Sequence, residues 1–376
     1  MLKNQFNLGS IIIFDLTIIG AGVIGLSIGK YFSQLGNSVL IIEKESRAGE
    51  GTSSRNSGVI HAGIYYPENS FKSRFCLEGN KMLYEYADEK NISHSKVGKY
   101  IVASQAGELN ALEKLFQQGI RNNVNLKYCS KEEIEEAIPQ IVCSSALFSP
   151  ETGIIDVPEF ITALEGDIQH KNGIVSFNTE FISAKKSKNF FEISCSDGTN
   201  FSIQSKTLVN ASGLSSDLIS YKIDQLDQRY IFPINFAKGH YFKYSAPNPF
   251  SSLVYPLADE FSLGIHVGFD LSGQLRFGPD LTWIDSIDFS FDESLKEKFI
   301  NSIHRYWPDM DPKKLHPDYV GIRPKIQNSN EGMQDFSILG PKEHGIDGLI
   351  NLQGIESPGV TSALAIGKYV SSLLRY

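Results

Sequence analysis

Six residues near the N-terminus carry the strongest chemical signal in the sequence. The motif Gly-Ala-Gly-Val-Ile-Gly at residues 20–25 follows a β-branched run and opens a segment with helical apolar spacing. In such a turn Gly20 permits a tight bend, Gly22 lets the backbone approach a pyrophosphate, and Gly25 allows close helix packing. Glu43 ends the next apolar run, where its carboxylate can accept hydrogen bonds from a ribose. This order predicts a dinucleotide-binding unit rather than an ordinary glycine-rich turn.

A second segment, at residues 51–63, indicates which dinucleotide is bound. It reads Gly-Thr-Ser-Ser-Arg-Asn-Ser-Gly-Val-Ile-His-Ala-Gly, which combines small residues, hydroxyls and one arginine. Such a stretch suits a long cofactor that runs along backbone, and it favours FAD over NAD. A serine-rich surface loop is the alternative, but the apolar Val-Ile pair before His61 is unusual for one. The cofactor contacts expected around this segment are Lys44, Thr52, Ser53, Ser54, Asn56, Ser57, Gly58 and Val59.

The C-terminal motif Gly-Ile-Glu-Ser-Pro-Gly at residues 354–359 precedes a helix expected from about residue 360. Reduction places negative charge on the N1 and C2-carbonyl edge of a flavin. Backbone N–H groups at a helix N-terminus stabilise such a charge by up to ~2 kcal/mol. Gly359, Val360 and Thr361 are the expected donors, with Gly354 in the preceding turn; the alternative is a helix start without a ligand.

The sequence resembles the D-amino-acid-oxidase-like flavoproteins, and within them the L-2-hydroxyglutarate dehydrogenases and oxidases. The resemblance extends over nearly the whole chain. The motifs that carry it lie at residues 56–66, 75–80, 208–213, 238–242, 254–256, 263–266, 321–324 and 354–359. The first and last of these are specific to the hydroxyglutarate branch, whereas Asn-Ala-Ser-Gly at 210–213 and Gly-Ile-Arg-Pro at 321–324 are shared more widely.

The resemblance implies an α/β fold with two interleaved domains. One is a discontinuous, Rossmann-like FAD-binding domain of the glutathione-reductase type, expected at residues 10–90, 150–228 and 322–376. The other is an α+β substrate domain with a mainly antiparallel sheet that roofs the flavin, expected at residues 91–149 and 229–321. Ala211 and Gly213 add to the expected FAD contacts.

The same resemblance assigns roles at the substrate. Arg323 would pair with a substrate carboxylate, and a guanidinium is suited to this because it offers a planar fork that stays charged. Oxidation of a 2-hydroxy acid releases the hydroxyl proton as hydride passes to flavin N5, so a base near neutrality is useful. His61 and His266 are the candidates for that base, and Tyr255 is a candidate hydroxyl donor on the roofing sheet.

Two departures from the hydroxyglutarate branch leave the substrate open. The chain has Lys-Gly-His at residues 238–240 where Arg-Gly-Glu is expected, and Lys325 follows Pro324 where that branch has Ala-Gln. His240 and Lys325 therefore become candidate substrate contacts. The Lys325 cation could serve a second carboxylate, or the pocket could be set for a different hydroxy or amino acid.

We therefore expect FAD-dependent oxidation of a small L-2-hydroxy acid, with L-2-hydroxyglutarate the leading candidate, to the 2-oxo acid. One alternative is a flavin-dependent amino-acid or amine oxidase of the glycine- or sarcosine-oxidase type. Another is an FAD-binding module without turnover. The electron acceptor (a quinone, a soluble carrier or oxygen), covalent flavin attachment through His61, and the oligomeric state stay open.

Composition excludes several other classes. A formal charge of -8 leaves no basic field for nucleic acid. The four scattered cysteines and the lack of an HExxH motif give no metal site. The apolar stretch at residues 11–29 is interrupted by Asp15 and several glycines, so a strand, turn and helix fit better than a membrane span. Without an evident targeting signal we expect a cytoplasmic protein and leave peripheral membrane contact open.

Periodicity supplies the elements that must position these residues. Helices are expected at residues 24–35, 71–89, 107–121, 131–137, 158–170, 293–306 and 360–374. Strands are expected at residues 14–19, 38–42, 100–104, 174–177, 181–185, 190–195, 199–203, 206–211 and 349–352, with several more between 239 and 277. Asp197-Gly198 supplies a hairpin turn.

Overall fold

A computed structural model describes residues 13–257 and 264–374. Residues 10–12 of the first expected FAD-binding segment, and Leu263 of the motif at 263–266, lie outside the described residues. The chain divides into two compact units. Unit 1 comprises the described residues of Met1–Ser54, Val157–Asn235 and Pro324–Tyr376, and unit 2 comprises those of Arg55–Asp156 and Phe236–Arg323.

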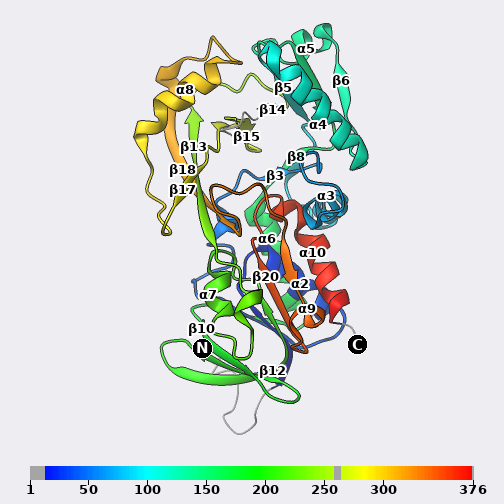
Figure 1. The fold of residues 1–376 in the computed structure, drawn as a ribbon, viewed down its shortest axis with the longest axis vertical. Helices are drawn as coiled ribbons and strands as arrows, with labels where there is room; N and C mark the ends of the chain where they lie inside the picture. The colour runs from blue at the N-terminus through cyan, green and yellow to red at the C-terminus, as the bar shows by residue number, and fades with distance from the viewer. Residues whose placement is uncertain (1–12, 258–263, 375–376) are drawn as a thin grey trace. The chain divides into compact units, whose positions relative to one another are not determined.

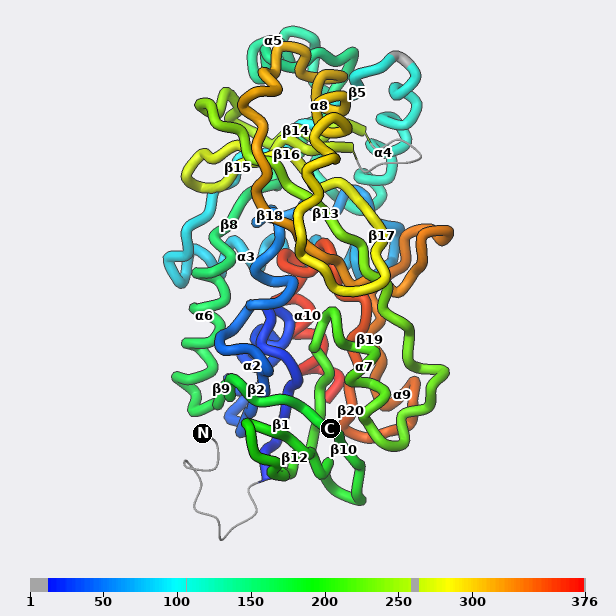
Figure 2. Tube along the Cα trace, turned by 90° about the vertical axis from the view of Figure 1, so that its left-hand side faces the viewer, coloured from blue at the N-terminus to red at the C-terminus, as the bar shows by residue number. Residues whose placement is uncertain are grey.

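Unit 1 is built on one mixed sheet with a parallel centre. Its strands are β1 (Ile13–Ile19), β2 (Val39–Ile42), β9 (Ile174–Ser176), β10 (Glu180–Lys186), β11 (Phe191–Ser196), β12 (Asn200–Asn210), β19 (Ser337–Leu339) and β20 (Leu349–Gln353). The parallel centre runs in the order β9-β2-β1-β12-β20 (Figure 2). Strands β10, β11 and β19 join it in antiparallel fashion. The helices are α2 (Val23–Gln34), α6 (Val157–His170), α7 (Ser216–Ser220), α9 (Pro341–His344) and α10 (Gly359–Leu373).

The register of β1 and β2 positions the glycine motif. Ile19 pairs with Ile42, and the N–H of Gly20 donates to the Ile42 carbonyl at 2.9 Å. Two parallel strands therefore end at the same edge of the sheet, so the turn that follows β1 lies beside the acid that follows β2. Gly20 has φ +101°, a conformation that favours glycine.

Helices α2 and α10 lie side by side in unit 1 (Figure 1). They approach closely because Gly367 of α10 has no side chain: a Cβ there would lie 2.6 Å from the Ser27 carbonyl oxygen of α2. This contact thus joins an N-terminal helix to the last helix of the chain.

We expect Gly367→Ala to lower the free energy of unfolding by about 1–3 kcal/mol, because the added methyl must push the two helices apart. Gly166→Ala in α6 is the matched control: nothing lies within 4 Å of a Cβ there, so helix propensity should stabilise the protein by about 0.5–1 kcal/mol. Urea unfolding of both variants measures the effects. An unchanged Gly367→Ala protein would contradict the close packing.

Unit 2 contains a large and a small sheet. The strands of the large sheet are β5 (Lys99–Ala103), β6 (Lys127–Cys129), β7 (Ser145–Ser149), β13 (Asn235–Tyr244), β14 (Leu253–Pro256), β15 (Val267–Phe269), β16 (Leu275–Phe277), β17 (Thr282–Ile284) and β18 (Leu315–Lys325). The small sheet has the order β3 (Val59–Ile60), β8 (Gly153–Ile155), β4 (His94–Ser95). The helices are α3 (Phe71–Lys90), α4 (Leu109–Arg121), α5 (Lys131–Ala137) and α8 (Lys296–His304). Its strand pairs are mainly antiparallel, with β5 and β14 parallel.

These two architectures confirm the predicted fold class, an α/β Rossmann-like unit and an α+β unit with a mainly antiparallel sheet. One detail differs: the strands expected at 199–203 and 206–211 are the single strand β12. Its first half pairs antiparallel with β11 and its second half parallel with β1, so neighbours on both sides hold it extended throughout.

Residues 55–90 group with unit 2, whereas the predicted boundaries join them to the FAD-binding segments. The physical reason lies in their partners. Strand β3 pairs with β8, and the Asn80 amide donates to the carbonyls of His61 and Glu151, each at 2.9 Å. These contacts tie the segment to its own unit.

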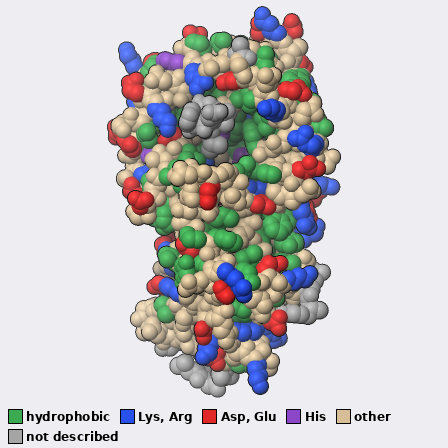
Figure 3. Space-filling view, viewed as in Figure 1, with side chains coloured by type: hydrophobic (Ala, Val, Ile, Leu, Met, Phe, Trp, Pro, Cys, Tyr) green, Lys and Arg blue, Asp and Glu red, His purple; other side chains and the backbone are tan. Residues whose placement is uncertain are grey.

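The surface carries both signs of charge. On the face that Figure 3 shows, acidic and basic side chains are interspersed rather than gathered by sign. Within residues 13–257 and 264–374, no helix has the length and apolar character needed to cross a membrane.

Candidate functional site

The glycine turn of unit 1 forms a cradle that excludes side chains. A Cβ at Gly25 would lie 2.0 Å from the Gly20 carbonyl oxygen, and one at Gly20 would lie 2.8 Å from the Ala211 carbonyl oxygen. The Ala211 N–H donates to the Ile19 carbonyl at 3.0 Å, so the end of β12 supports the turn. The structure thus brings Ala211 to the glycine motif, as expected for a backbone surface that a cofactor approaches.

The donors and acceptors around this cradle fit a dinucleotide. Helix α2 begins at Gly22 with no side-chain cap, and the Val23 N–H donates to Ser53 Oγ at 3.1 Å. The two Glu43 carboxylate oxygens accept from the N–H groups of Ala21 at 2.7 Å and Glu45 at 2.9 Å. Because each carboxylate oxygen has a further lone pair, Glu43 keeps acceptor capacity for ribose hydroxyls. A helix N-terminus beside an acceptor is what a pyrophosphate and ribose require, although Ser53 already accepts from the first N–H of this helix.

The start of α10 offers a second set of backbone donors in unit 1. The helix begins at Gly359 after Pro358, the Gly359 N–H donates to the Glu356 carbonyl at 2.5 Å, and Thr361 is fully buried. The Gly359 N–H is therefore engaged within its own turn, unlike the ligand donor that the sequence predicts. Gly354 has φ +66°, and a Cβ there would lie 2.8 Å from the Ile326 side chain. The turn is therefore held tightly under a helix N-terminus, which suits an anionic ligand group.

Other predicted cofactor residues are less well placed within their units. Lys44 is exposed and forms an ion pair with Glu45 at 3.6 Å. The Ser54 hydroxyl donates to the carbonyls of Glu50 and Gly51. The remaining predicted contacts are Thr52 and Gly213 in unit 1, and Asn56, Ser57, Gly58 and Val59 in unit 2.

Unit 2 gathers a second set of predicted residues around His61. Burial, together with the positive charges of Lys99 and Arg323, lowers the pKa of His61 to about 3. The imidazole is therefore neutral at pH 7 and can accept a proton. The ring of His266 stacks on Tyr255 with centroids 3.6 Å apart, and the ammonium of Lys99 lies 4.6 Å from the centroid of the same tyrosine.

Tyrosines lie against Arg323, the arginine predicted to bind a substrate carboxylate. Burial raises the pKa of Tyr241, while Arg323, Ser57 and Tyr319 act on it in the opposite direction. Tyr241 stacks on Tyr319 at 4.4 Å, and the Tyr319 hydroxyl donates to the Asn56 carbonyl at 2.7 Å. Arg323 thus lies against phenols that are themselves fixed, which preserves the direction of its guanidinium.

The charge balance of this cluster is unusual. Lys99 is 1% exposed, and its ammonium lies over two rings, Tyr65 at 4.7 Å and Tyr255 at 4.6 Å. Two such contacts stabilise a cation by a few kcal/mol at most, whereas burial of an ion costs several kcal/mol. Among the described residues, the groups whose charges act on Lys99 include no carboxylate. With Lys99 protonated, the cluster therefore holds excess positive charge that an anion would balance.

Two predicted substrate contacts, Lys325 and His240, each interact with an acidic residue of the protein. Lys325 lies in unit 1, buried, with its ammonium 2.7 Å from a Glu356 carboxylate oxygen. His240 is buried in unit 2, where its Nδ1 and backbone N–H both meet Asp280 Oδ1, at 3.0 Å and 2.8 Å. An acid already balances the Lys325 cation, so that lysine is poorly suited to the second-carboxylate role suggested by the sequence.

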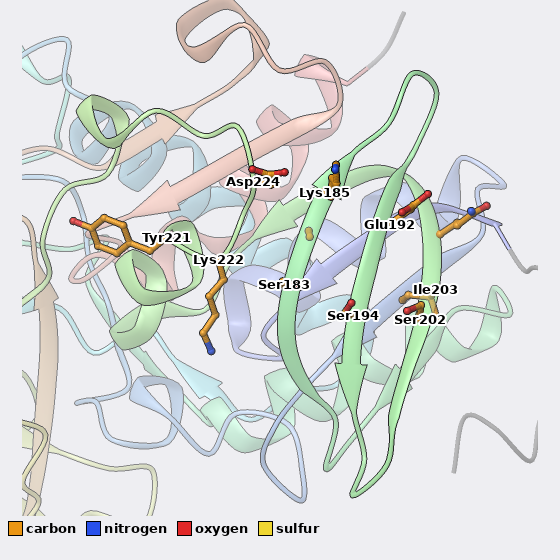
Figure 4. A pocket seen from close by; sticks show the side chains of 11 residues that line it. Ser183, Lys185, Glu192, Ser194, Ser202, Ile203, Tyr221, Lys222 and Asp224 are labelled. Carbon is orange, nitrogen blue, oxygen red and sulfur yellow. The ribbon is translucent and has the colours of Figure 1, made fainter.

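A surface hollow on unit 1 lies away from these residues. It has a volume of about 630 Å³ and is bordered by strands β10, β11 and β12 and by the turn after α7 (Figure 4). Its polar lining includes Lys185, Glu192, Lys222 and Asp224 and contains none of the predicted site residues. We assign it no role. Among the described residues, no three His, Cys, Asp or Glu side chains are grouped to hold a metal ion.

Comparison with known proteins identifies the family of the chain. The family model described as FAD dependent oxidoreductase (DAO) matches residues 15–373. The chain belongs to this family. As a DAO-family protein it is an FAD-dependent oxidoreductase, and the predicted family and cofactor are confirmed.

Individual relatives of this DAO-family chain differ in their substrates. The chain is 37% identical to a mitochondrial L-2-hydroxyglutarate dehydrogenase of Arabidopsis thaliana, over 95% of this chain and 83% of the relative. It is 31% identical to a glycerol 3-phosphate dehydrogenase of Caloramator mitchellensis, over 96% and 74%. An FAD-bound L-alpha-glycerophosphate oxidase from Mycoplasma pneumoniae superposes with a TM-score of 0.87 at 24% identity, covering 97% of this chain and 95% of that one. At this level of identity, the structural similarity shows a shared fold and does not indicate the substrate.

The sequence analysis did not select Lys99, Tyr65, Tyr241 or Tyr319. A signal for Lys99 was present: it follows Gly98 and starts an apolar strand, where a charged residue is rarely fully buried without a partner. The tyrosines carry no comparable local signal, because a strand tyrosine is common in any core.

The buried ammonium predicts a pH dependence of stability. Burial lowers the pKa of Lys99 from its ordinary value to about 7. Between about pH 7 and pH 10 the unfolded chain therefore binds a proton that the folded chain lacks, so stability rises with pH by at most about 1.4 kcal/mol per unit. We expect Lys99→Met to be more stable than the wild type at pH 7, with the difference closing by pH 10.

Urea unfolding of both proteins at constant ionic strength, followed by circular dichroism at several pH values, measures this difference. Taking the difference between the proteins removes the contribution of the tyrosines and cysteines that titrate in the same range. A gap that stays constant from pH 7 to pH 10 would show that Lys99 does not titrate as described.

Proposed function

We propose that this FAD-dependent oxidoreductase oxidises L-2-hydroxyglutarate to 2-oxoglutarate. The observation that carries the proposal is the cluster in unit 2, where two cations, Lys99 and Arg323, act on one neutral imidazole, His61. Oxidation of an anionic hydroxy acid needs cations to hold the acid and a neutral base to take its proton. The 37% identity to an L-2-hydroxyglutarate dehydrogenase supports this choice of acid.

The residues that would hold FAD lie mainly in unit 1. The backbone N–H groups at the start of α2 would face the pyrophosphate, Glu43 would accept from the ribose, and the first turn of α10 would stabilise negative charge on the reduced ring. Bound FAD supplies the two-electron oxidant, which accepts the hydride at N5.

The reaction assigns one role to each group of the cluster. Arg323 binds the C1 carboxylate and orients the neighbouring C2 carbon, and the Tyr255 hydroxyl donates to the substrate. As the C2–H bond breaks and its hydride is lost, His61 takes the hydroxyl proton and the C–O bond becomes a carbonyl. The acid thereby loses two electrons and two hydrogens. A bound carboxylate partly offsets the positive charges around His61, which raises its pKa and makes it a stronger base.

A substrate screen tests the proposal. We expect the purified protein to be yellow, and its flavin absorbance to bleach under anaerobic conditions on addition of L-2-hydroxyglutarate. The D-enantiomer is the control for stereochemistry. Bleaching by sn-glycerol 3-phosphate, or by glycine or sarcosine, with no response to L-2-hydroxyglutarate, would replace the proposed substrate with another class.

The base is tested by replacing each histidine in turn. We expect His61→Asn to slow flavin reduction by roughly 10²- to 10⁴-fold, because a positioned base typically contributes that factor. His266→Asn, which removes the ring stacked on Tyr255, should have a smaller effect. In the wild type the reduction rate should fall as the pH is lowered through the pKa of His61 in the substrate complex.

Anaerobic stopped-flow absorbance across a pH series measures these rates. His61→Asn should lose the low-pH decline, while His266→Asn should keep it. The reverse pattern, with the decline lost only in His266→Asn, would transfer the role of base to His266.

A further inference from the structure

We propose that Lys99 binds the second carboxylate of a dicarboxylic substrate, so that unit 2 selects dicarboxylic 2-hydroxy acids over monocarboxylic ones. This inference rests on the proposed function, which it deepens by naming the residue that sets the substrate class.

The ammonium of Lys99 is held in a fixed place. Lys99 starts β5, pairs with Ser149 of β7 on one side and with Leu253 of β14 on the other, and is 1% exposed. Its Nζ lies 4.7 Å from the ring centroid of Tyr65 and 4.6 Å from that of Tyr255. Two rings and two neighbouring strands therefore confine a cation that cannot swing out to water.

Two other buried lysines of the chain differ from Lys99 in their partners. Lys238 lies 2.9 Å from Asp288, and Lys325 lies 2.7 Å from Glu356. The charges that act on Lys99 include no carboxylate from the described residues. At Lys238 and Lys325 the protein supplies the acid, and at Lys99 an acid from the ligand would complete the same kind of pairing.

Arg323 is the second cation of the cluster, and two cations suit a substrate with two carboxylates. Lys99 and Arg323 both act on His61, so one imidazole lies within the influence of both. A substrate with a single carboxylate would neutralise one cation and leave the other buried and unbalanced, which is unfavourable. A substrate with a carboxylate at each end matches both charges. Its hydroxyl-bearing carbon then lies next to the carboxylate that Arg323 holds.

Binding of unreactive acids to the FAD-loaded protein tests the inference without turnover. Glutarate and pentanoate share a five-carbon chain and differ in one carboxylate. We expect the wild type to bind glutarate more tightly, and Lys99→Met to weaken glutarate binding by roughly 10- to 100-fold while pentanoate binding changes little. Calorimetry, or the shift of flavin absorbance on binding, measures both affinities.

The matching kinetic comparison uses L-2-hydroxyglutarate and L-2-hydroxypentanoate. Lys99→Met should lower kcat/KM for the first by a similar factor and leave that for the second nearly unchanged. Lys96→Met is the control, because Lys96 also lies over a tyrosine, Tyr84 at 4.9 Å, but is half exposed and paired with Glu151. It should keep the wild-type preference. If Lys99→Met does not fold, Lys99→Gln provides the same test.

The outcomes separate this inference from the proposed function. If Lys99→Met keeps the preference for the dicarboxylates, or loses affinity equally for both kinds of acid, the inference is overturned even if L-2-hydroxyglutarate reduces the wild-type flavin. If neither hydroxy acid reduces the wild type but glutarate binds through Lys99, the inference stands and the proposed reaction fails.

Discussion

The balance of charge inside unit 2 is the constraint on which the interpretation depends. A buried ammonium at Lys99 and the guanidinium of Arg323 surround His61, and the acids that neutralise other buried lysines have no counterpart at Lys99 among the described residues. A fold can retain such an imbalance when a ligand corrects it, because the burial cost that is borne in the empty state is recovered as affinity. The tyrosines add rigidity, so the charges stay separated and fixed.

Unit 1 would hold the anionic groups of FAD by a different physical means. Its cradle uses backbone N–H groups at the starts of two helices, where oriented dipoles favour negative charge without a buried side-chain cation. Glycine is required there because any side chain would meet backbone: at Gly25 a Cβ would lie 2.0 Å from a carbonyl oxygen. The two units would therefore have different roles. Unit 1 would hold the cofactor with fixed backbone dipoles, and unit 2 would hold the substrate with charged side chains and a group that accepts a proton.

Each unit is built from separate segments of the chain, so the two units are interleaved in sequence. Strand β18 carries the sequence Gly-Ile-Arg-Pro just before its last residue, Lys325, and the boundary between the units falls directly after Arg323. A Cβ at Gly321 would lie 2.4 Å from the Arg55 carbonyl oxygen, so this strand packs tightly against the start of the 55–59 segment within unit 2. Residues separated by more than 250 positions are thus brought together by one close backbone approach.

The sequence by itself determined the nucleotide cradle and the family. Gly20, Gly22, Gly25 and Glu43 are close along the chain, and a βαβ unit has few ways to fold, so local pattern was enough. Tertiary structure alone decided which charges meet. Lys325 looked available for a substrate until Glu356, 31 residues away, proved to neutralise it. Lys99 was not selected from the sequence, and only the sheet shows that β14 brings Tyr255 beside it while no acid of the described residues accompanies it. Pairing between distant side chains depends on strand order and register, and these are properties of the whole sheet that no short stretch of sequence encodes.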